Sequence, residues 1–379
     1  MQRVVVTARQ ARSLAAGHPW ILPEGLAEGR RGLVQGTCAA LFDGQGRALG
    51  TALASPGEPV ALRLWSREGE TLSREGVLGR VAAAWRRRAS LRSRGDTDAY
   101  RLVHAEGDAL PGLVAEAWGP WISVQVQTAA WDPWMDAVLD ALERLAKPEG
   151  ILLEGKPARG KLTPPEVEVR ESGLRYRVRP SDPKPGLFPD ERENRAWLAP
   201  RCKGKTVLNA FAFTGAFTVA AARAGAASVT SLDLSAPVLK RLEANLLLNG
   251  IDPERHLRVR GEAQETMGRW AREGRRFDLV ILDPPAYATH RGGRWQAARD
   301  YPALAQAACR LLAPGGLLAA ALTVQDVTPE GFERLLARGV EGAGRKTASL
   351  ERRGPPEDFP QLPAFPEGSY LKFAALRVD

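Results

Sequence analysis

The chain has 379 residues, of which 44% are hydrophobic and 26% are charged, an ordinary composition for a globular protein of two or three domains. Its formal net charge is +9, and this basic balance favours a nucleic-acid partner because binding to phosphates releases condensed counterions. No apolar run is long enough to span a membrane, and the basic N-terminus lacks the apolar stretch of a signal peptide. We therefore expect a cytoplasmic protein without a membrane partner.

The cysteines and histidines are too scattered to form a recognisable structural motif. The three cysteines are Cys38, Cys202 and Cys309, and no pair has CxxC spacing. The four histidines do not cluster either. Neither a disulfide framework nor a protein-bound metal is expected.

The N-terminal region, residues 1–70, is predicted to be a small β-rich domain with one helix over 8–16. Its short apolar or alternating runs are separated by glycine, proline and aspartate, as in strands joined by tight turns. A helix dense in arginine is then predicted over 74–95. Two interpretations of this helix stay open. It is either an RNA-binding edge that contacts phosphates through Arg86, Arg87 and Arg88, or a solvated linker.

The middle region, residues 71–182, is predicted to be an α+β domain. Beyond the arginine helix, three strand-like segments precede a helix over 131–146, and three further strand-like segments follow it. Strands around a single helix of this length are typical of a compact α+β unit.

The C-terminal region, residues 183–379, shows a regular alternation of strands and helices. The predicted strands are 206–211, 228–234, 257–260, 277–283, 317–323 and 370–378. Strand–helix alternation with right-handed crossovers predicts an α/β fold with a doubly wound sheet.

The first strand–helix junction of this sheet is a candidate cofactor site, because ligands of open α/β sheets bind at the carboxyl ends of strands. Gly215 lies there and lets the backbone approach a ligand without a Cβ in the way. Asp233 ends the second strand and can accept hydrogen bonds from ribose hydroxyls, although a helix N-cap is the alternative role. The chain has neither GxGxxG nor GxxxxGK[ST]. S-adenosylmethionine, which has no phosphate, is therefore favoured over a dinucleotide.

The fourth strand runs into Asp283-Pro284-Pro285, and these residues are candidate catalytic groups. The two prolines fix a rigid turn, so that Asp283 can accept a hydrogen bond from the target base or hold the methionine end of the cofactor. Tyr287 can stack on a flipped base. Glu262, after the third strand, is expected near the adenine. The alternative role for Glu262 is that of a first-turn carboxylate, which the helix dipole favours.

Several motifs, taken together, resemble one known family. The motifs are Gly17–Trp20 (GHPW), Arg101–Asp108 (RLVHAEGD), Pro111–Val114 (PGLV), Lys184–Arg195 (KPGLFPDERENR), Asn209–Gly215 (NAFAFTG), Asp283–Pro285 (DPP) and Phe365–Lys372 (FPEGSYLK). The chain is similar over nearly its whole length to the bacterial 23S rRNA methyltransferases of the RlmI/RlmO type. That resemblance implies an RNA-gripping PUA-like domain, an α+β middle domain and a Rossmann-like class I methyltransferase domain.

The resemblance also implies a set of site residues and partners. The cofactor pocket would be completed by the segment around Phe188, Asp190 and Arg192. From the NAFAFTG motif, the residues expected at the cofactor are Asn209, Phe211, Thr214 and Gly215. The implied cofactor is S-adenosylmethionine and the implied partner is 23S rRNA, while a monomer and a homodimer both stay open.

One departure from the family concerns the chemistry. Members that methylate cytosine C5 carry a nucleophilic cysteine after the strand that follows the Asp-Pro-Pro motif, whereas this chain has Thr323 there. Cytosine C5 is a poor nucleophile, and a thiolate must first add at C6 to generate an enamine. A threonine hydroxyl cannot replace that thiolate, which favours guanine N7 or another nitrogen as the methyl acceptor.

Three alternatives stay open at this point. A cytosine C5 enzyme would need an unforeseen route. A catalytically decayed RNA-binding or ribosome-assembly factor would be expected to lose cofactor residues such as Gly215, Asp233 and Asp283, all of which are present. A protein or small-molecule methyltransferase fits the C-terminal region, but not the basic charge or the PUA-like domain.

Overall fold

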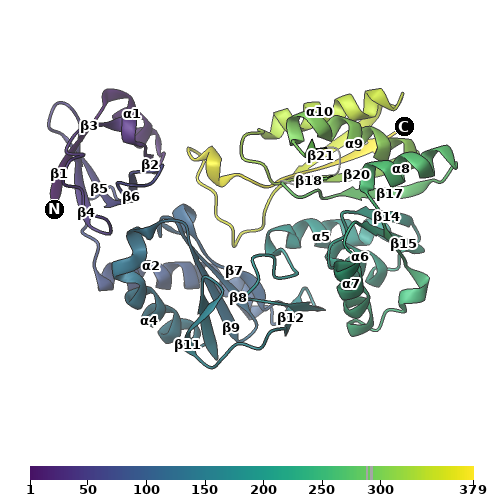
Figure 1. The fold of residues 1–379 in the computed structure, drawn as a ribbon, viewed down its shortest axis with the longest axis horizontal. Helices are drawn as coiled ribbons and strands as arrows, with labels where there is room; N and C mark the ends of the chain where they lie inside the picture. Colours follow the sequence, from purple (N-terminus) through teal and green to yellow (C-terminus); the bar gives the residue numbers. More distant parts are fainter. Residues whose placement is uncertain (287–288, 291–292) are drawn as a thin grey trace. The chain divides into compact units, whose positions relative to one another are not determined.

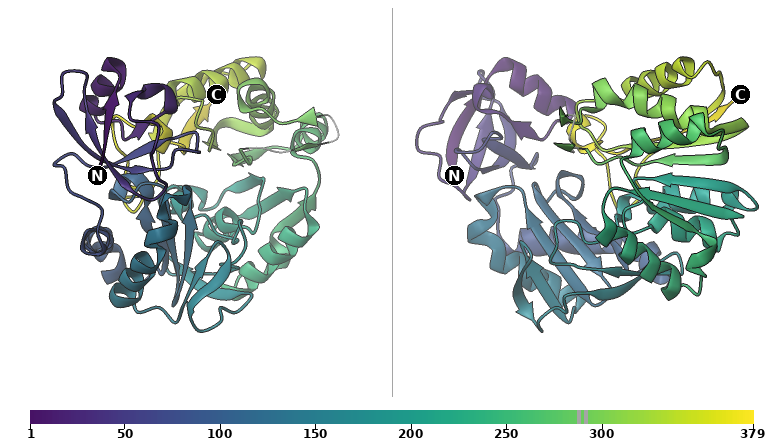
Figure 2. Two further views of the ribbon diagram at one scale, coloured as in Figure 1. Left: turned by 60° about the vertical axis from the view of Figure 1, so that its left-hand side comes forward. Right: turned by 45° about the vertical axis from the view of Figure 1, so that its right-hand side comes forward.

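The computed structural model describes residues 1–286, 289–290 and 293–379, and its ribbon is drawn in Figures 1 and 2. The chain forms two compact units that interleave along the sequence. The first unit comprises residues 1–169, 179–185 and 357–368, and the second comprises residues 170–178, 186–356 and 369–379. The predicted division into 1–70, 71–182 and 183–379 stays a prediction.

The first unit begins with a six-stranded sheet of order β2-β6-β5-β4-β1-β3. Its elements are β1 (Gln2–Val6), α1 (Ala8–Ala16), β2 (Trp20–Ile21), η1 (Pro23–Gly25), β3 (Leu26–Glu28), β4 (Cys38–Phe42), β5 (Ala48–Ala54) and β6 (Leu62–Ser66). Side chains alternate between the two faces of β1 and β4. Those of Val4, Val6, Ala39 and Leu41 point inward and pack in a small apolar core. Thr7 caps α1, as its side chain accepts from the backbone N–H of Gln10.

The same unit contains a five-stranded sheet of order β11-β10-β9-β8-β7. The elements are α2 (Arg74–Arg87), α3 (Ala89–Ser93), β7 (Ala99–His104), η2 (Ala105–Asp108), β8 (Leu113–Trp118), β9 (Trp121–Val126), η3 (Ala129–Trp134), α4 (Met135–Ala146), β10 (Gly150–Leu153) and β11 (Lys156–Gly160). The predicted continuous helix over 74–95 is interrupted at Arg88, so α2 and α3 are separate helices.

Residues 357–368 lie far along the sequence but pack within the first unit. Asp358 accepts a hydrogen bond from the backbone N–H of Arg101 at 2.9 Å. The rings of Phe365 and Trp20 meet edge to face, with centroids 4.7 Å apart. This segment connects two neighbouring strands of the second unit, β21 and β22 (bounds below), which explains why the two units interleave.

The second unit is built on a seven-stranded sheet of order β16-β15-β14-β17-β20-β22-β21. Its strands are β14 (Thr206–Ala210), β15 (Ser228–Asp233), β16 (Leu257–Arg260), β17 (Phe277–Leu282), β20 (Leu312–Leu322), β21 (Thr347–Arg353) and β22 (Lys372–Val378). Pairing is parallel except for β22, which is antiparallel to both of its neighbours. The predicted α/β class is confirmed. The sequence analysis missed β21, whose exposed and mostly polar TASLERR segment has no apolar periodicity.

Helices cover both faces of this sheet (Figures 1 and 2). The helices and short segments outside the sheet are η4 (Pro189–Glu191), α5 (Arg192–Leu198), η5 (Ala199–Cys202), α6 (Ala216–Arg223), α7 (Ala236–Leu248), η6 (Pro253–Arg255), α8 (Ala263–Arg272), α9 (Ala297–Leu311), α10 (Pro329–Gly342) and η7 (Pro366–Gly368), which lies in the first unit. Two small ribbons are β12 (Val167–Glu171) with β13 (Leu174–Val178), and β18 (Thr289–His290) with β19 (Gly293–Arg294). Helices α8, α9 and α10 share one apolar core with the sheet, and α5 and α6 share another.

The strand order reverses between β14 and β17, which places the topological switch point at their carboxyl ends. The strands β14 and β17 are nearly continuous apolar runs, as expected of parallel strands with both faces covered. None of the helices within the described residues combines the length and the apolar character that a bilayer crossing requires.

Candidate functional site

The loop from β14 into α6 has a strained backbone at the switch point. Phe211 and Phe213 have positive φ angles of 62° and 47°, and Gly215 has a φ of 85°. Positive φ at bulky residues is uncommon and is often found at ligand-binding sites. A Cβ on Gly215 would lie 2.3 Å from Cγ of Leu242 in α7. The glycine is therefore required by its backbone angle and by helix packing, a reason that differs from the predicted approach of a ligand.

Asp233, at the end of β15, holds this loop in place. Its Oδ2 accepts from the backbone N–H of Phe213 at 2.9 Å, and its Oδ1 accepts from the backbone N–H of Ser235 at 2.9 Å. The N-cap of α7 is Ser235 rather than Asp233. Each carboxylate oxygen keeps a second lone pair, so Asp233 can also accept from ribose hydroxyls.

Glu262 is the N-cap of α8. Its two carboxylate oxygens accept from the backbone N–H groups of Gln264 and Glu265 at 3.1 and 2.6 Å. This geometry matches the alternative that the sequence left open, a carboxylate favoured by the N-terminal end of a helix dipole. Its contact with adenine stays a prediction.

The segment around Phe188 is tied to the same loop. The ring of Phe188, which is 40% exposed, stacks on Phe213 with centroids 5.4 Å apart. The hydroxyl of Thr214 donates to the backbone carbonyl of Gly186, two residues earlier in the segment. Arg195 donates to the backbone carbonyl of Phe188 at 2.8 Å. Phe188 and Thr214, predicted at the cofactor from different motifs, are thus brought together.

Three carboxyl groups lie near the end of β17, and their negative charges interact. Asp190 accepts from the hydroxyl of Tyr370 at 2.8 Å. Glu191 is buried, and one of its oxygens accepts from the side-chain amide of Asn194 at 2.7 Å. Burial and the charges of Asp283 and Asp190 raise the pKa of Glu191. Burial, with the charge of Asp190, raises the pKa of Asp283 to about 7.

Three residues at or beside these carboxyl groups were not assigned a role from the sequence: Glu191, Arg195 and Tyr370. Each belongs to a motif that carries the family resemblance. The sequence shows that these residues are charged or aromatic, but it does not show which residue each of them contacts in the fold. Arg195 is buried and forms a bidentate pair with Glu171 at 2.7 and 2.6 Å. Its positive charge lowers the pKa of Asp283, opposing the effect of burial.

Two predicted cofactor residues point into the protein. The side chain of Arg192 is almost fully buried. Asn209 is also buried, and its amide donates to the hydroxyl of Thr218 in α6 at 2.9 Å. Their expected contact with the cofactor stays a prediction, and the visible contact of Asn209 joins β14 to α6.

Asp283 and Thr323 lie at the same edge of the sheet. Strands β17 and β20 are parallel neighbours, and each residue directly follows the last residue of its strand. Pro284 is buried and Pro285 is exposed in the turn that follows Asp283. Tyr287 lies outside the described residues.

The three cysteines lie in different surroundings. Cys202 and Cys309 are buried, and burial raises the pKa of each thiol to about 12. Cys38 lies in β4 of the six-stranded sheet. Within the described residues, no cluster of three or more His, Cys, Asp or Glu side chains could hold a metal ion.

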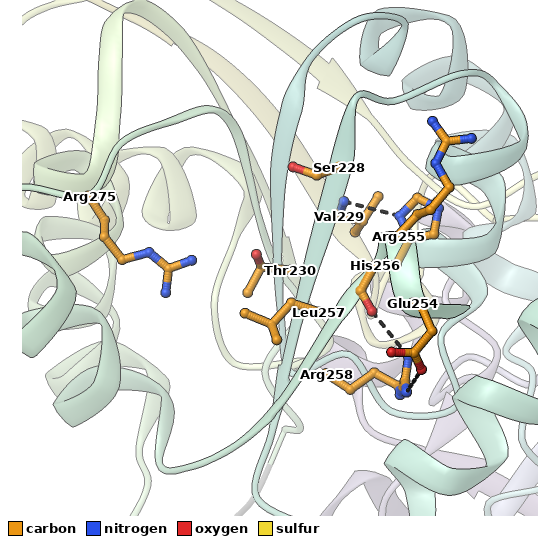
Figure 3. Close-up of a pocket in the computed structure, with 9 residues that line it drawn as sticks. All are labelled: Ser228, Val229, Thr230, Glu254, Arg255, His256, Leu257, Arg258 and Arg275. Atoms are coloured by element: carbon orange, nitrogen blue, oxygen red, sulfur yellow. Dashed lines mark hydrogen bonds and ion pairs between the residues drawn. The ribbon is translucent and has the colours of Figure 1, made fainter. Parts of the chain in front are cut away.

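The cavity drawn in Figure 3 lies elsewhere. It has a volume of about 380 Å³ and is lined by Ser228, Val229, Thr230, Glu254, Arg255, His256, Leu257, Arg258 and Arg275. Because Ser228 begins β15 and Leu257 begins β16, this cavity is at the amino edge of the sheet, opposite Asp233 and Asp283. No residue predicted to act at the cofactor lines it.

The predicted RNA-contacting arginines of α2 differ in their surroundings. Arg86 is exposed, and Arg87 is half exposed with its Nε 3.4 Å from Asp108. Arg88 is fully buried and pairs with both oxygens of Asp108 at 2.7 Å. The prediction that Arg88 contacts RNA is therefore wrong for this structure, because its guanidinium is enclosed and neutralised.

Comparisons with known proteins identify the family of the chain. A family model described as an S-adenosylmethionine-dependent methyltransferase matches residues 161–372, and one described as a PUA-like domain matches residues 4–67. The ribosomal RNA large subunit methyltransferase of Deinococcus radiodurans is 35% identical over 96% of this chain and 94% of its own length. The ribosomal RNA large subunit methyltransferase I of Klebsiella pneumoniae is 30% identical over 99% of this chain and 98% of its own length.

Solved structures show the same fold. The structure of SMU.776, a methyltransferase complexed with SAH, has a TM-score of 0.90 at 23% identity and covers 100% of both chains. A SAM-dependent methyltransferase from Streptococcus mutans has a TM-score of 0.88, also at 23% identity and full coverage. The chain belongs to the S-adenosylmethionine-dependent methyltransferases that carry an N-terminal PUA-like domain, the family of these curated relatives.

Proposed function

We propose that this enzyme methylates a base of 23S rRNA, and that the acceptor is a nitrogen, guanine N7 or another, attacked without a cysteine nucleophile. The names of the relatives support the substrate class. The observation that carries the choice of acceptor is Thr323, which follows β20 at the edge where Asp283 follows β17. Of the three thiols, two are buried with a raised pKa and the third lies in the first unit.

The residues at the strand ends suit S-adenosylmethionine. The cofactor is cationic at its sulfonium and ammonium groups, and a cation bound beside Glu191 and Asp283 would favour the ionised forms of these two carboxyl groups, which burial and neighbouring charge disfavour in the cofactor-free protein. Asp233 supplies acceptor oxygens beside the strained loop. The cofactor provides the activated methyl group when it is bound.

The chain's own contribution to transfer is orientation and proton control. A nitrogen lone pair forms the new N–CH3 bond as the S–CH3 bond breaks, and rate depends on alignment of the acceptor with the methyl group. Where the acceptor is an exocyclic amine, a proton must also leave. The carboxylate of Asp283, with a pKa of about 7, is suited to accept that proton near neutral pH.

We expect Asp233→Ala to weaken S-adenosylmethionine binding by about 1.5–3 kcal/mol, because hydrogen bonds to a charged acceptor are lost. Calorimetric titration of the folded variant measures this change. Asp233→Asn is the matched control, since it retains one acceptor oxygen and should lose less affinity. Unchanged affinity in Asp233→Ala, or an inert wild type, would contradict the cofactor assignment for this residue.

The cysteine-independent route is tested by a triple variant, Cys38→Ala, Cys202→Ala and Cys309→Ala. We expect it to transfer methyl groups to 23S rRNA at a rate within a fewfold of the wild type. Circular dichroism must first show that it folds, because Cys202 and Cys309 are buried and their loss leaves small cavities. A folded triple variant that binds cofactor but transfers nothing would restore the cytosine C5 mechanism. So would a covalent adduct of the wild type with RNA that contains 5-fluorocytosine.

The replacement of the family cysteine by Thr323 also favours a second candidate, a decayed enzyme that binds rRNA without modifying it. Mass spectrometry of rRNA from a deletion strain separates the two. Loss of one methyl group, restored by the wild-type gene, supports the enzyme. An unchanged methylation pattern supports the RNA-binding factor.

A further inference from the structure

We infer that Lys372 is a positioning residue for methyl transfer and that it acts through the turn that follows β20. This turn, residues 323–326, begins with Thr323 and is called the Thr323 turn below. Lys372 begins β22, and its ammonium group joins the Thr323 turn to Tyr370. The inference deepens the proposed function and rests on it, because it concerns the rate at which the acceptor base is methylated.

The register of the sheet brings Lys372 to the carboxyl edge of β20. Strand β22 is antiparallel to β20, and Lys372 pairs with Leu322, the last residue of β20. The first residue of β22 therefore lies beside the strand end that leads into Thr323. Parallel pairing of β17 with β20 brings Asp283 to the same edge.

The side chain of Lys372 is buried and binds two backbone carbonyls. It is 5% exposed. Its Nζ donates to the carbonyl of Val324, in the Thr323 turn, at 2.5 Å and to the carbonyl of Tyr370 at 3.2 Å. The hydroxyl of Tyr370 donates in turn to Asp190 at 2.8 Å. One ammonium group thus joins the Thr323 turn to a residue that contacts Asp190, which is predicted at the cofactor.

The burial of this ammonium group is energetically unfavourable, so stability alone does not account for it. Burial lowers the pKa of Lys372, and the negative charge of Asp326 opposes this effect only in part. The two acceptors of the ammonium group are neutral carbonyls, which replace its hydration incompletely. An apolar side chain of the same length would pack there without this cost. What the lysine adds is a fixed separation between the two carbonyls that it binds.

The Thr323 turn lies where a small displacement affects the reaction. The hydroxyl of Tyr301 donates to the carbonyl of Ala321 at 2.8 Å, so β20 is fixed near its end. Lys372 fixes the carbonyl of Val324, beyond the last residue of the strand. A misplacement of about 1 Å at a reacting centre can reduce the rate by about 10²-fold. We therefore expect the rate of transfer to depend on the bond from Lys372 to the Thr323 turn.

The test is single-turnover methyl transfer to 23S rRNA by the full chain of Lys372→Met, with saturating cofactor and RNA. The matched control is Arg345→Met. Arg345 donates to the carbonyls of Leu312, the first residue of β20, and Val378, the last residue of β22, both at 3.1 Å. It therefore joins the same two strands at the opposite edge of the sheet. Calorimetry measures the S-adenosylmethionine affinity of each variant, and denaturant unfolding measures its stability.

The two variants should separate rate from stability. We expect Lys372→Met to reduce the single-turnover rate by about 10²-fold. Its S-adenosylmethionine affinity should stay within about threefold of the wild type, because Tyr370 keeps its own hydrogen bond to Asp190. Arg345→Met should keep the rate within a fewfold of the wild type. It should nevertheless unfold at the same denaturant concentration as Lys372→Met or a lower one, because Arg345 makes more hydrogen bonds than Lys372.

The outcomes distinguish this inference from the function on which it rests. Equal losses of rate in the two variants would assign Lys372 a structural role and contradict the inference, as would an unchanged rate in Lys372→Met. If Lys372→Met does not fold, Lys372→Gln compared with Arg345→Gln decides in the same way, since a glutamine amide can still donate to one carbonyl. A wild type that binds S-adenosylmethionine but transfers no methyl group to 23S rRNA would overturn the proposed function, and the inference with it.

Discussion

Replacement of Asp283 by asparagine should reduce the rate of methyl transfer by about 10²-fold or more, the cost expected when a positioned acid–base group is removed. Asparagine has nearly the same shape but carries no negative charge and cannot accept a proton. Single-turnover transfer to 23S rRNA with saturating cofactor measures the chemical step. The prolines after Asp283 keep the turn in place, so the change should remain local.

The size of this loss also distinguishes the possible acceptors. If the acceptor is guanine N7, no proton leaves the attacking nitrogen, Asp283 contributes only orientation and charge, and the loss should be smaller than about 10²-fold. If the acceptor is an exocyclic amine, the loss should shrink at high pH, where solvent hydroxide assists proton removal. A folded Asp283→Asn variant with the wild-type rate at every pH would show that Asp283 takes no part in transfer.

The same substitution should make the cofactor-free protein more stable at neutral and higher pH. Burial raises the pKa of Asp283 from its ordinary 3.8 to about 7, so between these pH values the folded state holds a proton that the unfolded chain releases. Stability at this site is therefore lost as the pH rises from about 4 to 7. Asparagine does not titrate, and its stability curve should be flatter over this range.

Asp278 in β17, the strand that Asp283 follows, provides a control of the opposite sign. A hydrogen bond from the backbone N–H of Thr206, at 2.8 Å, lowers the pKa of Asp278. The ionised Asp278 therefore contributes to the free energy of unfolding at pH values above its ordinary pKa, and this contribution is lost as the pH falls through the lowered pKa of the folded state. Asp278→Asn should thus destabilise the protein at neutral pH, and denaturant unfolding of both variants across pH measures the contrast.

The fold was largely predictable because apolar periodicity determines the elements of the methyltransferase unit. Strands such as β14 and β17 are mostly apolar, and the turn that follows each is marked by glycine or proline. The edge strand β21 could not be predicted in this way. It exposes most of its side chains and is stabilised by backbone pairing with β22, which leaves no trace in its residue types.

The site was predictable in part. The positions of Asp233 and Asp283 at the carboxyl edge of the sheet could be predicted, because the topology of the sheet follows from the order of elements. The hydrogen bond of Tyr370 to Asp190 and the electrostatic interaction of Glu191 with Asp283 join chain segments far apart in sequence, so they required the structure. The misjudged residue, Arg88, shows the same limit, since the sequence gives no sign that Asp108 lies opposite it.

Arg88→Met should lower the free energy of unfolding by about 3–5 kcal/mol, the cost of removing one partner from a buried ion pair. Asp108 would keep the backbone N–H of His104 as a donor at 2.7 Å, but would lose both guanidinium hydrogen bonds. Arg88 also donates to the backbone carbonyl of Asp358, in the segment that returns from the second unit. Denaturant unfolding followed by tryptophan fluorescence measures the change.

Arg86→Met is the matched control, because Arg86 lies two residues before Arg88, in α2, and is exposed. Its replacement should lower the free energy of unfolding by less than about 0.5 kcal/mol. The double variant Arg88→Met with Asp108→Leu should recover part of the stability, since it removes the carboxylate that the single variant leaves buried.

For RNA binding, Arg86→Met should have a larger effect than Arg88→Met. Arg86→Met should flatten the salt slope if α2 contacts phosphates, whereas a buried Arg88 contributes nothing to that slope. A small stability loss in Arg88→Met, accompanied by a flatter slope, would show that its guanidinium leaves Asp108 to meet RNA.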